Sequence, residues 1–349
     1  MTWLKYAIHV TLLVLFSTAV WANSSQDEKL KSDISGTWFF SIDNDLLVSS
    51  DDDYTSGVQV GWVSGYLNSY GEGPIPNGLA EKLDDFAFLT GQNRQKFISH
   101  SLSHRIFTPG EIEVSEYIEG DIPYIGLLFA TLTAGAQDQT TMDAFSFHYG
   151  VAGPAALGEQ AQNGIHSVIG SPQVKGWKHQ VQNEILLNLN YEHRRRLASF
   201  NFSSGLKADV LGQVGGTLGN LISMATIGVG GRIGWGLADD YAIPPQFFGE
   251  ESIGSRPYSK TRENNAFWLF ALVNSSYINN AIFWDGNTFR DSASVDYSPM
   301  IGRLYVGAVT QLDHWKITFS VTKTTVPWDN PDNKVIQTYG RLSFGYAYN

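Results

Sequence analysis

The sequence contains no cysteine and no apolar run long enough to cross a membrane as a helix. A membrane-spanning helix needs about 20 consecutive apolar residues. After the N-terminal region the densest apolar stretches, 124–132 and 266–273, are far shorter. The lack of cysteine excludes a small domain held together by disulfides, as is typical of eukaryotic extracellular modules. It fits a protein of the bacterial envelope.

Positive charge is also scarce. The chain carries 23 Lys and Arg against 34 Asp and Glu, a net charge of −11. This balance argues against nucleic acid as a partner. An anionic lipid would need local basic groups or a bridging cation. Basic residues that could serve, by position alone, are Lys96, Arg105, Lys175 and Lys178.

Residues 1–22 are predicted to be a secretory signal peptide. Lys5 supplies the positive charge, 7–16 form an apolar core, and Ala22 offers a small-residue cleavage site. The core is too short for a membrane-spanning helix. Residues 23–349 are then expected to form one domain, because a barrel closes only when every strand is present.

Strict two-residue alternation of apolar and polar side chains repeats along the chain. In 315–322, Trp, Ile, Phe and Val alternate with Lys, Thr and Ser, and 341–348 follows the same pattern. Such segments form strands with one apolar face. Aromatic residues gather near the segment ends, and a signal peptide precedes them. Together these features predict an all-β fold, a transmembrane antiparallel β-barrel.

About twelve strands are expected, an even number as in bacterial barrels. They are placed at 37–45, 54–64, 97–107, 124–133, 142–151, 184–191, 197–207, 225–235, 265–273, 304–311, 315–322 and 335–348. The longer polar connections should carry short helical excursions; these are 68–95, 238–263 and 285–297.

The connection 153–183 is a candidate for chemistry at the rim. Pro154 and the segment 155–162 favour a short helix, and apolar alternation is absent. Gln162 and His166 would share one helix face at i, i+4 spacing. A single histidine in a polar loop is, however, most often only a surface residue.

A second polar concentration lies at the end of the first expected strand. Alternation turns Asn44 outward and Asp43 and Asp45 toward the interior. Carboxylate and amide oxygens suit Ca²⁺. An EF-hand is excluded, because Val48 stands at its sixth position and Tyr54 at its twelfth. The acidic run 51–53 is more simply a solvated loop, whereas Asn44 and Asp45 are favoured as functional residues.

No nucleophile elbow G-x-S-x-G and no zinc helix H-E-x-x-H occurs in the chain. Instead, several spaced segments resemble the lipid A 3'-O-deacylase (LpxR-type) outer-membrane family. They are Asp-Asn-Asp-Leu at 43–46, Asp-Tyr-Thr-Ser-Gly at 53–57, Asp-Ile-Pro-Tyr-Ile-Gly at 121–126, the spaced Gly, Gln, Asn, His and Trp residues of 153–184, and Asp-Gly-Asn-Thr-Phe at 285–289.

The resemblance implies a twelve-stranded barrel in the bacterial outer membrane, with its active site between the barrel wall and the outer leaflet. The implied reaction is Ca²⁺-dependent hydrolysis of the ester that holds the 3'-linked acyloxyacyl chain of lipid A, with lipopolysaccharide as substrate. Asn44, Asp45, Thr55 and His166 stand at the positions of the family's active-site residues. By this resemblance His166 activates water, and Asp45, Asn44 and Thr55 are the expected metal ligands.

The sequence departs from the family pattern at two positions. Pro172 stands where the family has a glutamate six residues after the histidine, and Ile122 replaces the signature arginine. Glu159 or Glu184 could take the place of the missing carboxylate. Two alternative functions stay open: a non-catalytic barrel that acts as a pore or structural protein, and an esterase acting on another membrane lipid.

Overall fold

The computed structural model describes residues 35–48, 54–91, 94–238, 240–242, 265–329 and 335–348. The predicted signal peptide, the acidic run 51–53 and most of the 238–263 connection lie outside these ranges.

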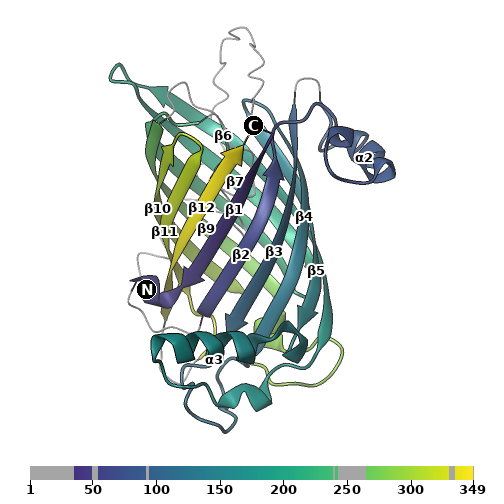
Figure 1. Cartoon of the computed structure of the whole chain (residues 1–349), viewed down its shortest axis with the longest axis vertical. Coiled ribbons are helices and arrows are strands. Elements are labelled where there is room, and N and C mark those ends of the chain that lie inside the picture. Colours follow the sequence, from purple (N-terminus) through teal and green to yellow (C-terminus); the bar gives the residue numbers. More distant parts are fainter. Residues whose placement is uncertain are drawn as a thin grey trace.

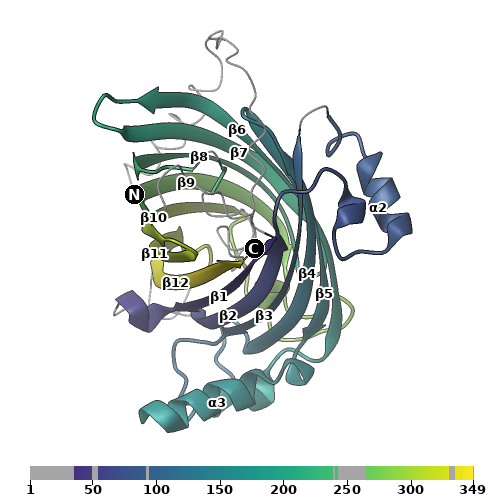
Figure 2. The same ribbon diagram turned by 45° about the horizontal axis from the view of Figure 1, so that its top comes forward.

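Twelve antiparallel strands close into a barrel in which β1 pairs with both β2 and β12 (Figures 1 and 2). The strands are β1 (Gly36–Asn44), β2 (Tyr54–Ser64), β3 (Gln95–Phe107), β4 (Ile125–Gln137), β5 (Thr141–Ala152), β6 (Glu184–Asn201), β7 (Leu206–Gly219), β8 (Ile222–Trp235), β9 (Asn265–Ala281), β10 (Met300–Leu312), β11 (Trp315–Thr325) and β12 (Ile336–Tyr348). The predicted fold class and strand number are confirmed.

One pair of strands differs from the prediction. The expected strands 184–191 and 197–207 are a single long strand, β6, followed by a turn, and β7 occupies 206–219. The arginine run at 194–196 interrupts the apolar alternation, but Arg194 points into the barrel and pairs with Glu192. The glycine-rich segment 212–219 resembles a loop in sequence, yet it forms wall.

The two faces of the wall differ as the alternation requires. In β6, Ile185, Leu187 and Leu189 are exposed on the outer face, and Asn188 and Asn190 are buried inside. An apolar outer face is what lipid acyl chains cover in an outer-membrane barrel. No helix among the described residues is long and apolar enough to cross a membrane.

The two ends of the barrel carry connections of different length. At one end, here the terminal rim, β1 begins and β12 ends; the turns at 138–140, 202–205 and 313–314 are short, and the connections 65–94 and 236–264 are long. At the other end, here the α3 rim, the connections 108–124, 153–183 and 282–299 are long, 45–53 and 326–335 are of intermediate length, and 220–221 is a short turn. Three of the four short turns thus lie at the terminal rim. Since outer-membrane barrels have short periplasmic turns, we infer that the α3 rim faces the outside of the cell.

Charged side chains fill the interior near the terminal rim. Arg232 pairs with Asp209 and Asp240, and Arg194 donates to the carbonyl oxygen of Tyr241. All of these residues are buried. The described part of the connection after β8 therefore folds back into the mouth of the barrel.

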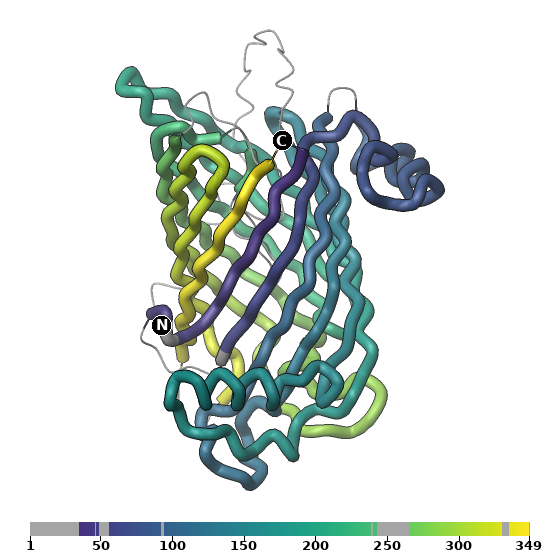
Figure 3. Tube along the Cα trace, in the orientation of Figure 1, coloured from purple at the N-terminus to yellow at the C-terminus, as the bar shows by residue number. Residues whose placement is uncertain are grey.

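Two helical excursions lie outside the barrel wall. At the terminal rim the β2–β3 connection carries η3 (Tyr70–Glu72) and α2 (Asn77–Asp84). At the opposite rim the β5–β6 connection carries η4 (Pro154–Ala156), α3 (Gly158–Ile169) and η5 (Gly176–His179). Short helices were predicted in both connections, and α3 extends seven residues beyond the predicted end at 162. Figure 3 follows the chain through both excursions.

Candidate active site on the outer wall

Helix α3 packs against the outer face of the barrel. A Cβ atom placed on Gly126 of β4 would lie 3.0 Å from the Cα atom of Gly158, so only two glycines permit this approach. His104 of β3 donates from Nε2 to the Ala156 carbonyl oxygen over 2.7 Å. Beneath the helix, Ile106 is buried in a cluster against which Ala161 packs. The helix therefore starts on β4 and covers the outer face of β3.

A row of residues in register runs under the helix toward β1. Asn44 pairs with Ser56, Ser56 with Ile106, and Ile106 with Gly126. The three steps from Gly126 to Asn44 span about 14 Å, at about 4.8 Å per strand.

The helix and the row have similar lengths. From Gly158 to His166 the helix advances eight residues, which is about 12 Å. Figure 1 shows α3 lying across the ends of β5 to β1. Because its first residue rests on Gly126, this length carries His166 toward the β1–β2 end of the row.

The His166 ring is held in one tautomer. Its Nδ1 atom lies 2.6 Å from the carbonyl oxygen of Pro172. Since a carbonyl can only accept, Nδ1 carries the proton, and in the neutral ring Nε2 is then unprotonated. The residue at the family's glutamate position thus orients the histidine through its main chain. A backbone role of this kind cannot be recognised from side-chain type.

Several signature residues of 153–184 other than His166 hold the helix in place by hydrogen bonds. Gln162 accepts a hydrogen bond from the Trp177 indole (2.9 Å). The Asn163 side chain donates to the Val174 carbonyl oxygen and accepts from the Val174 amide. Asn183 accepts from the Ala155 amide over 2.7 Å. The helix ends at Ile169, and the next residue, Gly170, has a φ of 76°, in the left-handed region that glycine tolerates. These supporting roles depend on contacts between segments of the connection, which residue type alone does not predict.

Asn44 and Asp45 lie together where β1 ends and η2 (Asp45–Val48) begins. Asp45 is buried and Asn44 half-buried. Thr55 belongs to β2 beside Ser56, the partner of Asn44, but its side chain lies outside the described set. The backbone thus brings these three residues to one end of two neighbouring strands, while His166 comes from α3.

Asp43 is not available to this site. The prediction that it faces the interior is confirmed: its carboxylate accepts from Arg105 (3.0 Å) and from Arg341 (2.7 Å), and both Asp43 and Arg105 are buried. Arg105 was therefore wrong as a surface contact for lipid. Lys96 pairs with Asp84 near α2, far from this rim. Lys175 and Lys178 are exposed beside α3.

Oxygen donors at the strand end suit a hard cation such as Ca²⁺. Within the ranges that the structure describes, no group of three or more His, Asp or Glu side chains could hold a metal ion. A cation at Asn44 and Asp45 would therefore need further oxygens, from amides, backbone or water.

Both carboxylate oxygens of Glu184 are engaged in hydrogen bonds. One of its oxygens accepts from Asn220 (2.9 Å), and the other accepts from the Asn287 side chain and the Thr288 amide (3.1 and 2.9 Å). Asn287 also bonds the main chain of Gln182 in both directions. The signature segment 285–289 is thus a clasp that joins two rim connections.

The model of the family described as Outer membrane protein LpxR matches residues 8–348. The chain belongs to the LpxR outer-membrane protein family. Its fold also matches that of LpxR from Salmonella typhimurium, with a TM-score of 0.71 and 17% identity over 89% of this chain and 100% of that one. The family and the closed barrel place the protein in the bacterial outer membrane.

Two other solved barrels match with lower TM-scores. The β domain of the Bordetella autotransporter BrkA has a TM-score of 0.43 and 11% identity, over 90% of this chain and 100% of that one. The KdgM porin has a TM-score of 0.36 and 8% identity, over 90% and 99%. No curated protein sequence matches the chain.

Proposed function

We propose that this LpxR-family protein is a Ca²⁺-dependent lipid A deacylase, which hydrolyses the ester of the 3'-linked acyloxyacyl chain. The observation that carries the proposal is the hydrogen bond from His166 Nδ1 to Pro172, on a helix that packs against the outer wall. It leaves Nε2 as a base on the lipid side of the barrel. Membership of the LpxR family supports the choice of lipid A as substrate.

The exposed side of α3 is apolar, which suits a site reached from within the outer leaflet. Leu157, Ile165, Val168 and Ile169 are exposed along one face of the helix. Exposed apolar side chains on an outward-facing helix bury favourably among acyl chains. A lipid ester held in the leaflet would then reach the space between α3 and the wall without leaving the membrane.

In the proposed reaction, Nε2 of His166 takes a proton from water as the oxygen attacks the ester carbonyl carbon. The imidazolium returns that proton to the leaving sugar oxygen when the C–O bond breaks. The products are a free 3'-hydroxyl and an acyloxyacyl carboxylic acid. Bound Ca²⁺ would polarise the carbonyl as a Lewis acid. Asp45 would hold the cation, with Asn44 and Thr55 as further ligands or as donors to the developing oxyanion.

The test is mass spectrometry of hexa-acylated lipid A incubated with the folded protein, with Ca²⁺ or with EDTA. We expect loss of one 3'-acyloxyacyl unit only when Ca²⁺ is present. No change in lipid A, combined with release of fatty acid from phospholipid, would instead assign the protein to the esterases of other membrane lipids.

The interior argues against a pore. Buried charged residues and residues 240–242 occupy the barrel near the terminal rim. We therefore expect no steady conductance in planar bilayers. A stable ion current, together with lipid A left intact, would favour the pore.

A further inference from the structure

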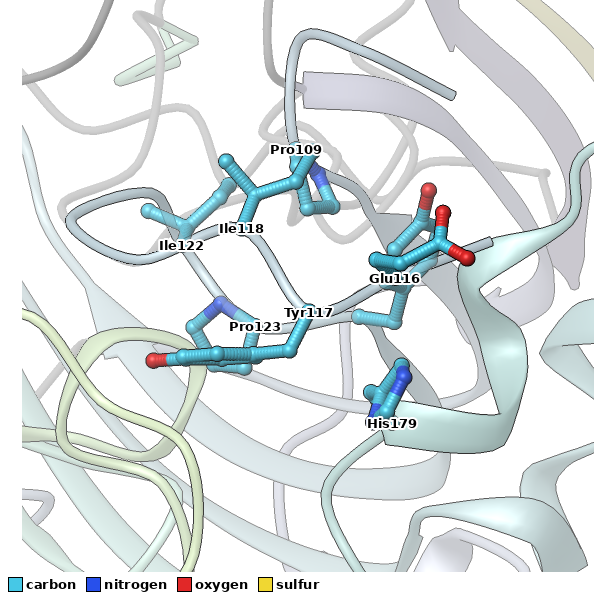
Figure 4. A pocket seen from close by; sticks show the side chains of 8 residues that line it. Pro109, Glu116, Tyr117, Ile118, Ile122, Pro123 and His179 are labelled. Carbon is cyan, nitrogen blue, oxygen red and sulfur yellow. The ribbon is translucent and has the colours of Figure 1, made fainter. Parts of the chain in front are cut away.

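The connections at the α3 rim are packed closely together. In the pocket between the β3–β4 connection and η5, side chains that include Ile122, Pro123 and His179 leave room for about one water molecule (Figure 4). The Lys175 amide also donates to the Ile112 carbonyl oxygen, which joins the two connections. The excursion at the terminal rim, in contrast, presents exposed aromatic side chains.

That excursion, here the α2 excursion (residues 65–91), covers part of the outer wall. Its buried side chains pack against Ile98 of β3 and Ala134 of β4. Both of these wall residues lie on the outer face, because each is an even number of residues from His104 or Gly126 of the same strand. Figures 1 and 2 show α2 outside β4 and β5. The α2 excursion thus occupies a surface that lipid would otherwise contact.

Two aromatic rings form one edge of the α2 excursion. Phe86 and Phe88 are 41% and 55% exposed. The Phe86 ring lies edge-on to that of Phe145 on β5, with 4.8 Å between their centroids, and the Phe88 ring lies 5.5 Å from that of Tyr191 on β6. Such ring pairs have preferred geometries that hold the side chains in place. Both rings are therefore fixed against the outer wall, and a large part of each stays uncovered.

The polarity of the wall changes at the level of these two rings. Toward the middle of the barrel, the next outward pair in register is Phe147 and Leu189, which are exposed and apolar. Toward the terminal rim, the next outward pair is Asp143 and His193, which share a hydrogen bond of 2.8 Å. Arg94, just after the excursion, also donates to Asp143 over 2.7 Å. Since a charge on the outer face of a barrel is costly at the membrane midplane and tolerated near its boundary, the apolar belt ends at the two rings.

Elsewhere on the barrel, the strands themselves supply aromatic side chains at this end. Exposed aromatic residues lie near the terminal-rim ends of β1, β8, β9, β11 and β12: Trp38, Trp235, Phe267, Trp315 and Tyr346. Outer-membrane barrels carry such girdles of aromatic residues at the membrane boundary. Over β3 to β5 the α2 excursion covers the wall, and its own rings take the corresponding position.

We propose that the α2 excursion is an interfacial anchor, in which Phe86 and Phe88 insert into the phospholipid leaflet on the periplasmic side of the outer membrane. Apolar side chains of a helical segment that lies on a membrane bury at the boundary between headgroups and acyl chains. Glu81, Lys82 and Asp85 of the same segment are exposed and remain among the headgroups or in water. The anchor sets the height of the barrel in the membrane, and it does not depend on the proposed reaction.

The test uses spin labels, because a chain without cysteine accepts a single labelled cysteine at any chosen position. The protein is folded into vesicles of phosphatidylethanolamine and phosphatidylglycerol, and relaxation of the label by O₂, which concentrates in lipid, is compared with relaxation by a water-soluble nickel chelate. At Phe88→Cys the effect of O₂ should exceed that of nickel, as at Leu189→Cys on the lipid-facing wall. At Glu81→Cys, the control on the same excursion, the effect of nickel should be the larger. A label at Phe88→Cys that behaves like the one at Glu81→Cys would overturn the anchor.

A second position keeps both rings in place. Ala87 is exposed between Phe86 and Phe88, so a label at Ala87→Cys should also be relaxed more strongly by O₂ than by nickel. A stronger effect of nickel at this position would show that the intact rings lie in water, and the proposal would be wrong. Weak relaxation by both reagents, with spin–spin broadening that disappears on dilution with unlabelled protein, would show that a second copy covers the rings. That result would also refute insertion into the leaflet.

Discussion

His166 donates its Nδ1 proton to the carbonyl oxygen of Pro172, six residues further along the chain and 2.6 Å away. The bond spans the end of α3, where Gly170 turns the chain back. A proline at this position has no carboxylate, but its carbonyl oxygen fixes the tautomer that leaves Nε2 unprotonated. A side chain is therefore not needed to orient this base.

Replacing His166 should strongly reduce lipid A hydrolysis and leave Ca²⁺ binding unchanged. We expect His166→Asn to lower lipid A hydrolysis by roughly 10²- to 10⁴-fold, the usual effect of losing a general base. Calorimetric Ca²⁺ binding should be unchanged, because the proposed ligands are on β1, η2 and β2 and not on α3. The assignment would be refuted by a variant that retains full turnover in the mass-spectrometric assay.

Removing the proposed metal ligand Asp45 should reduce both hydrolysis and Ca²⁺ binding. Asp45→Ala is expected to abolish hydrolysis and to weaken Ca²⁺ binding, as EDTA would in the wild type. Glu81→Ala provides the control, since Glu81 is an exposed carboxylate on α2 at the opposite rim. Equal Ca²⁺ dependence in Asp45→Ala and wild type would place the cation elsewhere.

The clasp residue Glu184 should matter for stability and not for metal binding. Glu184→Gln replaces one acceptor oxygen by a donor, facing Asn220, Asn287 and the Thr288 amide. Hydrogen bonds to a charged group contribute about 1.5–3 kcal/mol each, so the free energy of unfolding in urea should fall by about that amount. The Ca²⁺ concentration for half-maximal activity should stay the same; a large increase would make Glu184 a ligand.

Breaking the interior ion pairs of Asp43 with Arg105 and Arg341 should lower the free energy of unfolding. Asp43→Asn leaves Arg105 and Arg341 without their shared carboxylate, and loss of one partner of a buried pair costs about 3–5 kcal/mol. Tryptophan fluorescence in vesicles during urea unfolding measures this loss. Ser41→Ala is the matched control, because Ser41 is a buried polar residue of the same strand. If both variants unfold at the same urea concentration, the ion pair contributes nothing to stability.

Acid should destabilise helix α2 at the terminal rim. Although burial acts in the opposite direction, hydrogen bonds from Lys96 and Ser69 lower the pKa of Asp84 below its ordinary value of 3.8. A lowered folded-state pKa stabilises the fold above the unfolded-state pKa, and this contribution disappears as the pH falls through the folded-state value. Protection of the α2 amides from hydrogen exchange, measured relative to the intrinsic exchange rate at each pH, should therefore fall below about pH 4. In Asp84→Asn this protection should already be low at neutral pH and should change less in acid; an unchanged pH dependence would contradict the assignment.

Local sequence pattern determined most of the barrel. Side chains alternate at every second residue of a strand wherever it lies, so apolar alternation identified the twelve-stranded class and the outward position of Asn44. The alternation did not predict the bounds of β6 and β7. Arginines that point into the barrel and glycines in the wall resemble loop residues when their ion-pair partners and packing are unknown. The clustering of Asn44, Asp45 and Thr55 was also within reach, since neighbouring strands bring chain segments close together.

Only the tertiary structure decided how the helix meets the wall. The closeness of Gly126 and Gly158, the burial of Ile106 under α3 and the clasp of Glu184 by Asn287 join segments far apart in the chain. The role of Pro172 depends on its carbonyl direction, which is a property of the folded backbone and not of the residue type. The alternation of a strand is a local property of the sequence. A site between a helix and the barrel wall depends on contacts that form only when the barrel has closed.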